Sequence, residues 1–338
     1  MFPSAFESKG PAVSAAEQPR ILTVTLNPTV DLTFDVRRLI SGGKNRAQLS
    51  SVQGGGGGIN VARCLARLGV PTVALHTSGR EVGRRLSRLL DEEGLLHRGI
   101  DIGAETREAV VIGEEWSGHS YHVVPPGPRL SEAEEARCME AIVSAARDFP
   151  YLVLTGGATP GLRDDFSADI LRSANADGIT TVLDIAGAQL RKALQEKAFL
   201  IRLDRKEAGA LIGRAIESFS DARAANQCVL ETGATDNVVT TVGALGAVYS
   251  DREFDHEISA PPLSNPARSD ACAGDSLVAA LTSRLAAGDS CLRACEYGVA
   301  AAAATVMLPG TRVFEQDIVD ELRTAVHTRR SLRSRPTK

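Results

Sequence analysis

The sequence predicts an α/β protein with a mostly parallel sheet that helices cover on both faces. Short apolar, β-branched segments alternate with longer helical patterns along most of the chain, as in successive strand–helix–strand units. Apolar residues make up 43% of the 338 residues and aromatic residues only 4%, while glycine numbers 31. This composition favours helices packed closely on a sheet over an aromatic-rich binding sandwich. The length suits one large domain with a small accessory element.

The first ordered element is a buried strand at 21–26, which consists of apolar and β-branched residues. The same kind of pattern predicts further strands at 72–75, 151–154, 180–183, 199–203, 237–242 and 247–250. Helical patterns are found at 58–68, 82–93, 132–147, 163–176, 276–287, 291–308 and 316–327. Strands that alternate with helices are joined by crossovers, which place helices on both faces of the sheet.

Two segments, at about 31–52 and 107–124, interrupt this alternation. Both alternate polar and apolar residues, and neither contains a helical pattern. Two such excursions from a parallel core can pair with each other, so we predict a small antiparallel β lid. The chain would then consist of a disordered tail at 1–19, one domain at 20–327 and a basic, solvated tail at 328–338.

Charge, cysteine content and hydropathy exclude several classes of function. The net charge is −4, and because the basic tail contributes +5, the rest of the chain carries −9; this argues against nucleic acid as the main partner. The six cysteines are scattered without a Cys-x-x-Cys pair, so we expect neither a disulfide framework nor a metal cage. No apolar run reaches the length of a bilayer span, and the first 20 residues have no apolar signal region. We therefore expect a cytoplasmic protein that binds no membrane.

Five consecutive glycines at 54–58 lead into the first predicted helix, and Asn60 lies in its first turn. Glycine lets the backbone approach a ligand closely, and the helix start supplies free N–H groups and a positive dipole end. The spacing matches neither the dinucleotide-binding pattern nor a Walker-type phosphate loop, which disfavours an NAD-dependent oxidoreductase. The segment is either a ligand-binding loop or a flexible glycine-rich turn.

Two further segments carry candidate chemistry. The sequence DACAGDS at 270–276 precedes an alanine-rich helix; N–H groups there can stabilise a developing phosphoryl charge, and Asp275 can accept a proton from an attacking hydroxyl. Alternatively, Asp275 only caps the helix. The sequence TVGALGA at 241–247 joins two predicted strands, and a hairpin with glycine at its positive-φ positions is sufficient to explain it.

The glycine-rich segment at 54–58 and the Gly–Asp turn at 270–276 resemble, in this order, the two signature motifs of the ribokinase-like, PfkB-type carbohydrate kinases. The resemblance extends over about 21–326. Within that family the chain is most similar to the 6-phosphofructokinases, on the motifs TLNPTVD at 25–31, GGGGINVAR at 55–63, YHVVPPGPRL at 121–130 and PGT at 309–311. The resemblance implies a three-layer α/β/α core with a β lid. It also implies a glycolytic activity in which ATP, with Mg²⁺, phosphorylates the 1-hydroxyl of fructose 6-phosphate.

The resemblance assigns roles to individual residues. Asp275 would be the general base, in a catalytic turn that also contains Cys272, Ala273 and Gly274. The residues expected to bind the sugar are Asp31, Gly55, Gly56 and Asn60, and those expected to bind its phosphate are Lys44 and Arg107, which otherwise read as ordinary surface cations. The residues expected to contact ATP are Arg202, Thr241, Gly243 and Gly246, with Asp204 and Glu207 organising Mg²⁺ through water.

Three departures from the family pattern fall in the nucleotide half. Cys272 stands where the family has glycine, Asp204 where it has asparagine, and Gly157 where it has serine. A Cβ atom at position 272 costs about 1–2 kcal/mol if that residue requires a positive φ. Two alternatives stay open: a kinase of tagatose 6-phosphate or fructose 1-phosphate, and a catalytically weakened relative that binds a phosphosugar. Because lids of this family often pair across a two-fold axis, we also expect a homodimer.

Overall fold

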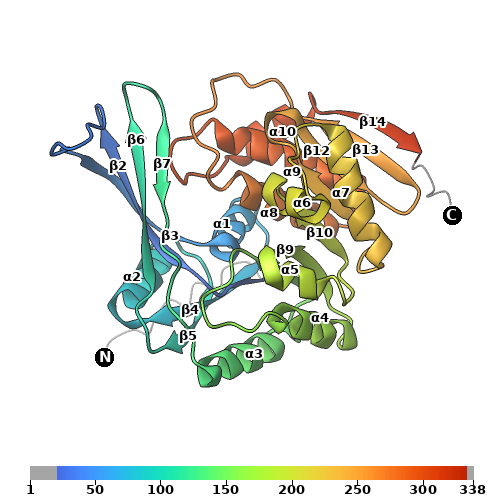
Figure 1. Ribbon diagram of the computed structural model, residues 1–338, viewed down its shortest axis with the longest axis horizontal. Coiled ribbons are helices and arrows are strands. Elements are labelled where there is room, and N and C mark those ends of the chain that lie inside the picture. The colour runs from blue at the N-terminus through green and yellow to red at the C-terminus, as the bar shows by residue number, and fades with distance from the viewer. Residues whose placement is uncertain (1–20, 333–338) are drawn as a thin grey trace, which may run out of the picture.

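Two sheets organise the protein in a computed structural model that describes residues 21–332. The ten-stranded sheet lies between layers of helices, and the four-stranded sheet projects from one side of it (Figure 1). The tail predicted at 1–19, and residues 333–338 of the predicted basic tail, lie outside the described range.

Seven adjacent strands of the larger sheet are parallel. In spatial order they are β5 (His97–Ile102), β4 (Thr72–Gly79), β1 (Ile21–Thr25), β8 (Tyr151–Thr155), β9 (Thr180–Asp184), β10 (Leu200–Leu203) and β11 (Val238–Thr241). Three antiparallel strands follow, which are β12 (Gly246–Ser250), β13 (Phe254–Ser259) and β14 (His327–Leu332). The predicted mostly parallel sheet is thus confirmed.

The strand order reverses between β1 and β8, because the chain builds outward from β1 to β4 and β5 on one side and from β8 to β11 on the other. The carboxyl ends of strands on either side of such a switch point border a crevice in which ligands of open α/β sheets bind. The topology therefore places the candidate site next to Thr25 and Thr155, the last residues of these two strands.

Helices cover both faces of the larger sheet. One face carries α3 (Glu132–Ala146), α4 (Phe166–Ala176), α5 (Gly187–Ala193), α6 (Arg205–Ile212) and α7 (Phe219–Thr232). The other carries α1 (Gly57–Arg67), α8 (Ala273–Ala286), α9 (Cys291–Val306) and α10 (Gln316–Arg323), and α2 (Arg80–Glu92) packs against β4 and the smaller sheet. Ile21 and Leu22 enter opposite clusters because successive side chains of a strand point to opposite faces.

The smaller sheet is formed by the two segments predicted to make a lid. Its strands, in spatial order, are β3 (Gln48–Gly55), β2 (Thr29–Val36), β6 (Arg107–Glu114) and β7 (Ser120–Val123). The two outer pairings are antiparallel, as expected, but the central β2–β6 pairing is parallel. The reason is that β2 and β6 each continue from a strand of the parallel sheet, β1 and β5, and so run in the same direction.

Six strands and α-helices of the structure were not predicted, namely β5, β13, β14, α5, α6 and α7. The strand β5 lies at the edge of the larger sheet and has a largely polar, partly exposed sequence, so its hydrophobic signal is weak. Two of the helices carry a signal that the periodicity analysis overlooked. Each begins with a capping box, formed by Asp204 with Glu207 in α6 and by Ser218 with Asp221 in α7.

The expectation of a frayed basic tail is wrong for its first residues, because His327–Leu332 forms the edge strand β14. The register places Arg329 opposite Glu257, and their side chains form an ion pair with an N–O distance of 2.7 Å. Arg330 lies over the ring of Phe254, 4.5 Å from its centroid. The buried carboxylate of Glu257 thus gives this basic segment a specific partner. No helix in the described part of the chain could cross a membrane.

Candidate active site

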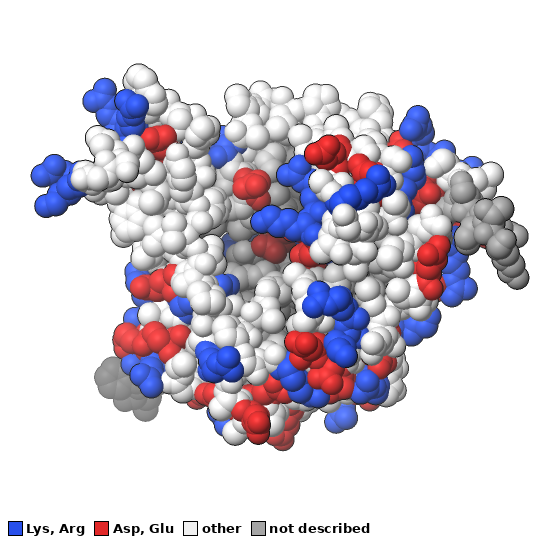
Figure 2. Space-filling view, in the orientation of Figure 1, with Lys and Arg blue, Asp and Glu red and all other residues white. Residues whose placement is uncertain are grey.

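The predicted site residues converge at the carboxyl edge of the larger sheet, beside the smaller sheet. Thr241 and Asp184 end β11 and β9, and Asp31 lies on β2, which continues from β1. The N-termini of α1 and α8 meet here as well, since Asn60 of α1 contacts Asp275 of α8. Figure 2 shows a hollow between the smaller sheet and the main body, in which both acidic and basic side chains are visible.

The glycine-rich loop is held rigidly against this hollow. The Oγ1 atom of Thr25 accepts a hydrogen bond from the backbone N–H of Ile59 at 2.9 Å. A Cβ atom on Gly55 would lie 2.2 Å from Oδ2 of Asp31, and one on Gly56, whose φ is +108°, would lie 2.7 Å from Cγ2 of Thr25. Glycine is therefore required here by the close approach of neighbouring protein atoms, which contradicts the interpretation of a flexible turn.

Asp275 is positioned by a side chain from another helix. Its Oδ2 accepts a hydrogen bond from Nδ2 of Asn60 at 2.8 Å. Burial, with a smaller contribution from the neighbouring Asp184, raises the pKa of Asp275 to about 6. The alternative that Asp275 only caps the helix is wrong, because Cys272 occupies the N-cap position of α8. Asp275 is ionised above pH about 6 and can accept a proton there.

The turn before α8 has the conformation that makes a side chain at its first position costly. Cys272 has φ 60° and ψ 1°, in the left-handed region, where an L-residue is disfavoured by about 1–2 kcal/mol. Its Sγ lies 3.6 Å from the carbonyl oxygen of Thr311, and burial raises the pKa of its thiol. The N–H of Ala273, one of the expected phosphoryl donors, already donates to the carbonyl of Asp270 at 3.3 Å. The N–H groups of Gly274 and Asp275 come next in the first turn.

Arg202 links the ends of three strands to this turn. Its Nη1 donates to Oδ1 of Asp184 at 2.9 Å, and its Nη2 donates to Oγ1 of Thr241 at 3.0 Å. A Cβ atom on Gly274 would lie 2.9 Å from Nη2. Thr155 donates to the second carboxylate oxygen of Asp184 at 3.0 Å. The structure thus brings the predicted ATP residues Arg202 and Thr241 next to the catalytic turn.

The two predicted magnesium residues form the capping box of α6. Asp204 Oδ1 accepts hydrogen bonds from the N–H groups of Lys206 and Glu207 at 2.7 and 2.8 Å, and Glu207 Oε2 accepts one from the N–H of Asp204 at 2.6 Å. Burial, followed by the nearby Asp184, raises the pKa of Glu207 to about 7. This excess of negative charge suits a cation. Within residues 21–332 no three acidic, histidine or cysteine side chains form a metal cage, so Mg²⁺ would be held mainly by phosphates and water, as it prefers.

The two predicted ATP-binding glycines have different constraints. A Cβ atom on Gly246, whose φ is +119°, would lie 2.0 Å from the carbonyl oxygen of Ile258. The pairing of β12 with β13 therefore explains this glycine without a ligand, as the hairpin interpretation requires. A Cβ atom on Gly243, whose φ is +58°, would lie 3.4 Å from Cζ of the Arg205 guanidinium, at ordinary contact distance. Gly243 therefore faces a cation, the guanidinium of Arg205.

The two predicted phosphate-binding cations are placed differently. Arg107 lies at the start of β6, where it donates to the carbonyl oxygens of Pro125 at 2.7 Å and Asn27 at 2.8 Å. It lowers the pKa of Asp31, which burial nevertheless raises to about 6. Its Nε is buried and has no partner among the described residues. Lys44 lies in the exposed connection between β2 and β3, at the outer end of the smaller sheet (Figure 1).

Sequence comparison decides the family. Residues 24–317, which include every predicted site residue, match the model of the pfkB family carbohydrate kinases. The chain belongs to this family. It is therefore a phosphotransferase that uses ATP and a sugar hydroxyl as acceptor, and the NAD-dependent oxidoreductase is excluded.

Individual relatives of this carbohydrate kinase are similar over nearly their whole length. An ATP-dependent 6-phosphofructokinase isozyme 2 from Mycobacterium tuberculosis (strain CDC 1551 / Oshkosh) is 32% identical over 310 residues, which cover 92% of this chain and 91% of the relative. The crystal structure of phosphofructokinase-2 from Escherichia coli in complex with potassium is 31% identical, with a TM-score of 0.85. The structure of the same protein in complex with fructose-6-phosphate is 30% identical, with a TM-score of 0.83. Each comparison covers 90% of this chain and 98% of the other. Arabidopsis thaliana ribokinase, 20% identical with a TM-score of 0.69 over 90% of this chain and 98% of its own, shows the ribokinase-like fold.

Three residues of this kinase's site were missed by the sequence analysis, namely Arg63, Thr155 and Asp184. Asp184 directly follows the predicted strand at 180–183, and an acidic residue at the carboxyl end of a parallel strand is a usable signal. Arg63 was quoted only as part of a motif. Its role depends on partners from other elements, among them Glu93 at the end of α2.

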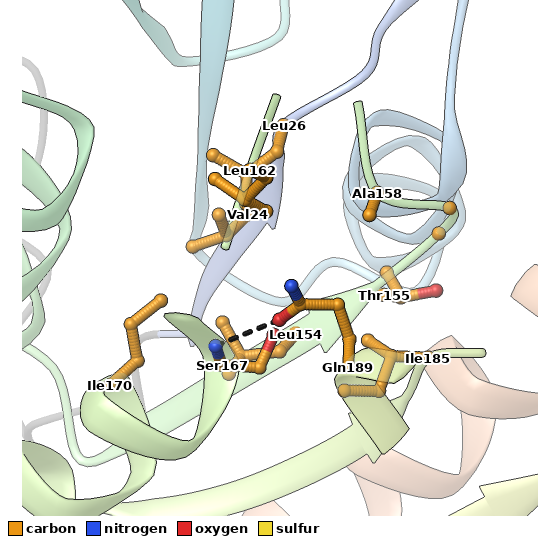
Figure 3. A pocket seen from close by; sticks show the side chains of 12 residues that line it. Val24, Leu26, Leu154, Thr155, Ala158, Leu162, Ser167, Ile170, Ile185 and Gln189 are labelled. Carbon is orange, nitrogen blue, oxygen red and sulfur yellow. Dashed lines mark hydrogen bonds between the residues drawn. The ribbon is translucent and has the colours of Figure 1, made fainter. Parts of the chain in front are cut away.

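A small cavity lies beneath the loop that follows β8, and Thr155 of the site forms part of its lining (Figure 3). Its volume of about 30 Å³ leaves room for about one water molecule. Most of its lining is apolar, including Val24, Leu26 and Ile170, and Gln189 accepts a hydrogen bond from the N–H of Ser167 at 2.9 Å. It is a gap in the packing and not a binding site for sugar or nucleotide.

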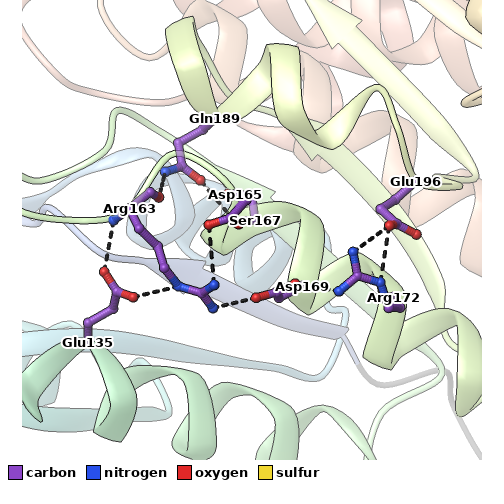
Figure 4. Close-up of polar contacts among 8 residues, drawn as sticks. All are labelled: Glu135, Arg163, Asp165, Ser167, Asp169, Arg172, Gln189 and Glu196. Carbon is purple, nitrogen blue, oxygen red and sulfur yellow. Dashed lines mark hydrogen bonds and ion pairs between the residues drawn. The ribbon is translucent and has the colours of Figure 1, made fainter. Parts of the chain in front are cut away.

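A network of ion pairs borders this cavity on the surface (Figure 4). Arg163 donates to Glu135 of α3 at 2.7 Å and to Asp165 at 3.2 Å, and it also contacts Asp169 of α4. Arg172 similarly connects α4 to Glu196 at 2.6 Å. These exposed pairs hold the helices of one face together but lie outside the site, and each contributes about 0–1 kcal/mol.

Proposed function

We propose that this carbohydrate kinase transfers the γ-phosphoryl group of ATP to the 1-hydroxyl of fructose 6-phosphate, with Mg²⁺ as the metal. The observation that carries the proposal is the Asn60–Asp275 hydrogen bond of 2.8 Å, which holds a carboxylate at the start of α8 beside the sugar-binding loop. Relatives that are named as 6-phosphofructokinases support the choice of substrate. A cytoplasmic location stays a prediction from the sequence.

In the proposed reaction Asp275 accepts the proton of the 1-hydroxyl as its oxygen bonds to the γ-phosphorus. The bond between the γ-phosphorus and the bridging oxygen of ATP breaks at the same time, and ADP leaves. Mg²⁺, when bound beside Asp204 and Glu207, supplies charge neutralisation. The N–H groups of Gly274 and Asp275 stabilise the transferring group.

The sugar half of the site would orient the acceptor. Asp31, held against Gly55, accepts hydrogen bonds from ring hydroxyls, and Asn60 contacts the base. Arg107 would bind the 6-phosphate, while Lys44, at the exposed outer end of the smaller sheet, stays a prediction from the sequence. The smaller sheet covers the hollow and excludes water that would otherwise hydrolyse ATP.

We also propose a homodimer formed through the smaller sheet. Several large apolar side chains of this sheet and its loops are exposed, namely Ile40 (60%), Leu49 (50%), Trp116 (70%), Tyr121 (41%) and Val123 (59%). Such a cluster marks an interaction surface. Analytical ultracentrifugation should give the dimer mass, and Trp116→Lys should shift it toward the monomer; a monomer for the unchanged protein would contradict the proposal.

The substrate is tested by measuring ADP release with MgATP and a panel of fructose 6-phosphate, tagatose 6-phosphate, fructose 1-phosphate, fructose and ribose. We expect the highest kcat/KM with fructose 6-phosphate. A higher value with tagatose 6-phosphate or fructose 1-phosphate would name that kinase instead. Asp275→Asn should abolish turnover but retain binding of the sugar phosphate; near-normal turnover would refute the base assignment.

The strained backbone of Cys272 favours a second candidate, a weakened relative that binds a phosphosugar. Under this alternative the whole panel would give no turnover, while fructose 6-phosphate would still raise the melting temperature. Cys272→Gly, which restores the residue of the family motif, should then raise turnover by orders of magnitude.

A further inference from the structure

The helix α1 carries a buried cation that contacts the residue holding the base. Arg63 lies one turn after Asn60, so both side chains project from the same face of the helix. Its Nη1 donates to Oδ1 of Asn60 at 2.8 Å. The Arg63 side chain is only 7% exposed.

Two further contacts fix the Arg63 guanidinium in place. Its Nε and Nη2 donate to the two carboxylate oxygens of Glu93, at the end of α2, at 2.6 and 3.0 Å. Its Nη2 also donates to the carbonyl oxygen of Gly54, the first glycine of the loop. A chain of hydrogen bonds therefore runs from Glu93 through Arg63 and Asn60 to Asp275.

The chemistry of these groups makes the chain directional. A guanidinium can only donate hydrogen bonds, so it must face the oxygen of the Asn60 amide. The amide nitrogen then has to face Asp275, where it donates to an ionised carboxylate and leaves Oδ1 of Asp275 without a partner among the described residues. A reversed amide would set its oxygen against the carboxylate.

We propose that Arg63, held by Glu93, is a positioning residue that fixes the orientation of Asn60 and thereby keeps Asp275 ionised and aimed at the acceptor hydroxyl. The inference rests on the proposed role of Asp275 as the base. Arg63 touches neither reacting atom in this role, and it acts through Asn60. The same guanidinium holds the first carbonyl of the sugar loop, so it couples loop and base.

The acid limb of the kcat–pH profile, where kcat falls as Asp275 becomes protonated, measures this role of Arg63. The charged groups that face Asp275 come from three elements: Arg63 from α1, Asp184 from β9 and Arg202 from β10. The neighbouring thiols of Cys64 and Cys272 have raised pKa values and stay neutral on this limb. Removing the Arg63 cation leaves the carboxylate less stabilised, so the limb should move to higher pH.

The experiment compares Arg63→Met with Arg67→Met in the full-length protein, at saturating MgATP and fructose 6-phosphate. Arg67 is the matched control, since it lies on the same helix one turn further along and pairs with Glu315. We expect Arg63→Met to lower kcat at least tenfold and to shift the acid limb upward. Arg67→Met should leave both unchanged.

Two further variants separate positioning from folding. Arg63→Met/Glu93→Gln leaves no Glu93 carboxylate without its cation, and it should recover thermal stability while kcat stays low. Arg63→Lys keeps a buried cation but cannot reach all three partners, so it should lower kcat with a smaller shift of the limb. A kcat and an acid limb equal to those of the unchanged protein in Arg63→Met and Arg63→Lys would overturn the inference. Retained turnover in Asp275→Asn would instead refute the proposed function.

Discussion

The guanidinium of Arg202 and the carboxylate of Asp184 form a buried ion pair with an N–O distance of 2.9 Å, and their side chains are 11% and 7% exposed. The pair joins β10 to β9 next to the catalytic turn, since a Cβ atom on Gly274 would lie 2.9 Å from Nη2 of Arg202. Neither residue can lose its partner without leaving an uncompensated buried charge.

Replacing Arg202 with methionine should destabilise the protein by about 3 kcal/mol, because Asp184 would stay buried without its cation. Urea unfolding measures this loss. The matched control is Arg147→Met, which removes an exposed pair with Asp177 (3.1 Å) and should cost less than about 1 kcal/mol. Equal losses in the two variants would show that the buried pair has no special role.

Cys272→Gly should stabilise the protein by about 1 kcal/mol, because glycine adopts the φ of 60° without strain. The control is Cys272→Ala, which removes the thiol but keeps the Cβ atom and its strain. Thermal unfolding of both variants separates the two causes. A gain in the alanine variant as large as in the glycine variant would trace the effect to the thiol.

Asp31 should make the protein less stable as the pH rises through about 6. Its pKa is raised from 3.8 to about 6 by burial, so between these values the folded state binds a proton that the unfolded state has lost. The contribution is fully present below pH about 4 and is lost above pH about 6. Asp31→Asn should therefore raise the melting temperature above that of the unchanged protein, and this increase should be larger at pH 7.5 than at pH 4.5.

The control for Asp31 is Asp35→Asn, an exposed residue of the same strand. Its effect on the melting temperature should be small and equal at the two pH values. If Asp31→Asn behaved in the same way, the raised pKa of Asp31 would be refuted.

Gly55→Ala should raise the KM for the sugar phosphate at least tenfold, because the new Cβ atom would lie 2.2 Å from Oδ2 of Asp31 and force that carboxylate to move. The KM for ATP should change little, since Arg202 and Thr241 of the nucleotide half lie on other strands, β10 and β11. Steady-state kinetics with each substrate varied in turn measures both. Gly103→Ala, at an exposed glycine that meets only the end of the Glu134 side chain at 3.3 Å, serves as the control.

Much of the fold could be predicted because its signals are local. The strand at 21–25 consists of apolar and β-branched residues and the segment at 57–67 has a helical period, so both elements appear in the sequence itself. The edge strand β14 could not be predicted, since its residues are polar and its stability comes from pairing with β13. Strand pairing of this kind exists only in the folded protein, when β13 is in place.

The candidate site divides in the same way. The residue types, Asp31, Asn60, Gly274 and Asp275 among them, were recognised from motifs of adjacent residues. The sequence could not show that Asn60 bonds to Asp275, because the two are 215 residues apart. Nor could it show that Asp204 and Glu207 hydrogen-bond to backbone N–H groups at the start of α6.

By itself, then, the sequence determined the class of fold, the lid segments and the family, since these depend on periodicity and on short motifs. The tertiary structure decided how the groups are charged and aimed. Arg63 acquires a function only between Glu93 and Asn60, and Asp275 acquires a pKa of about 6 only when burial removes it from water. Both effects depend on distances between elements, which no local pattern encodes.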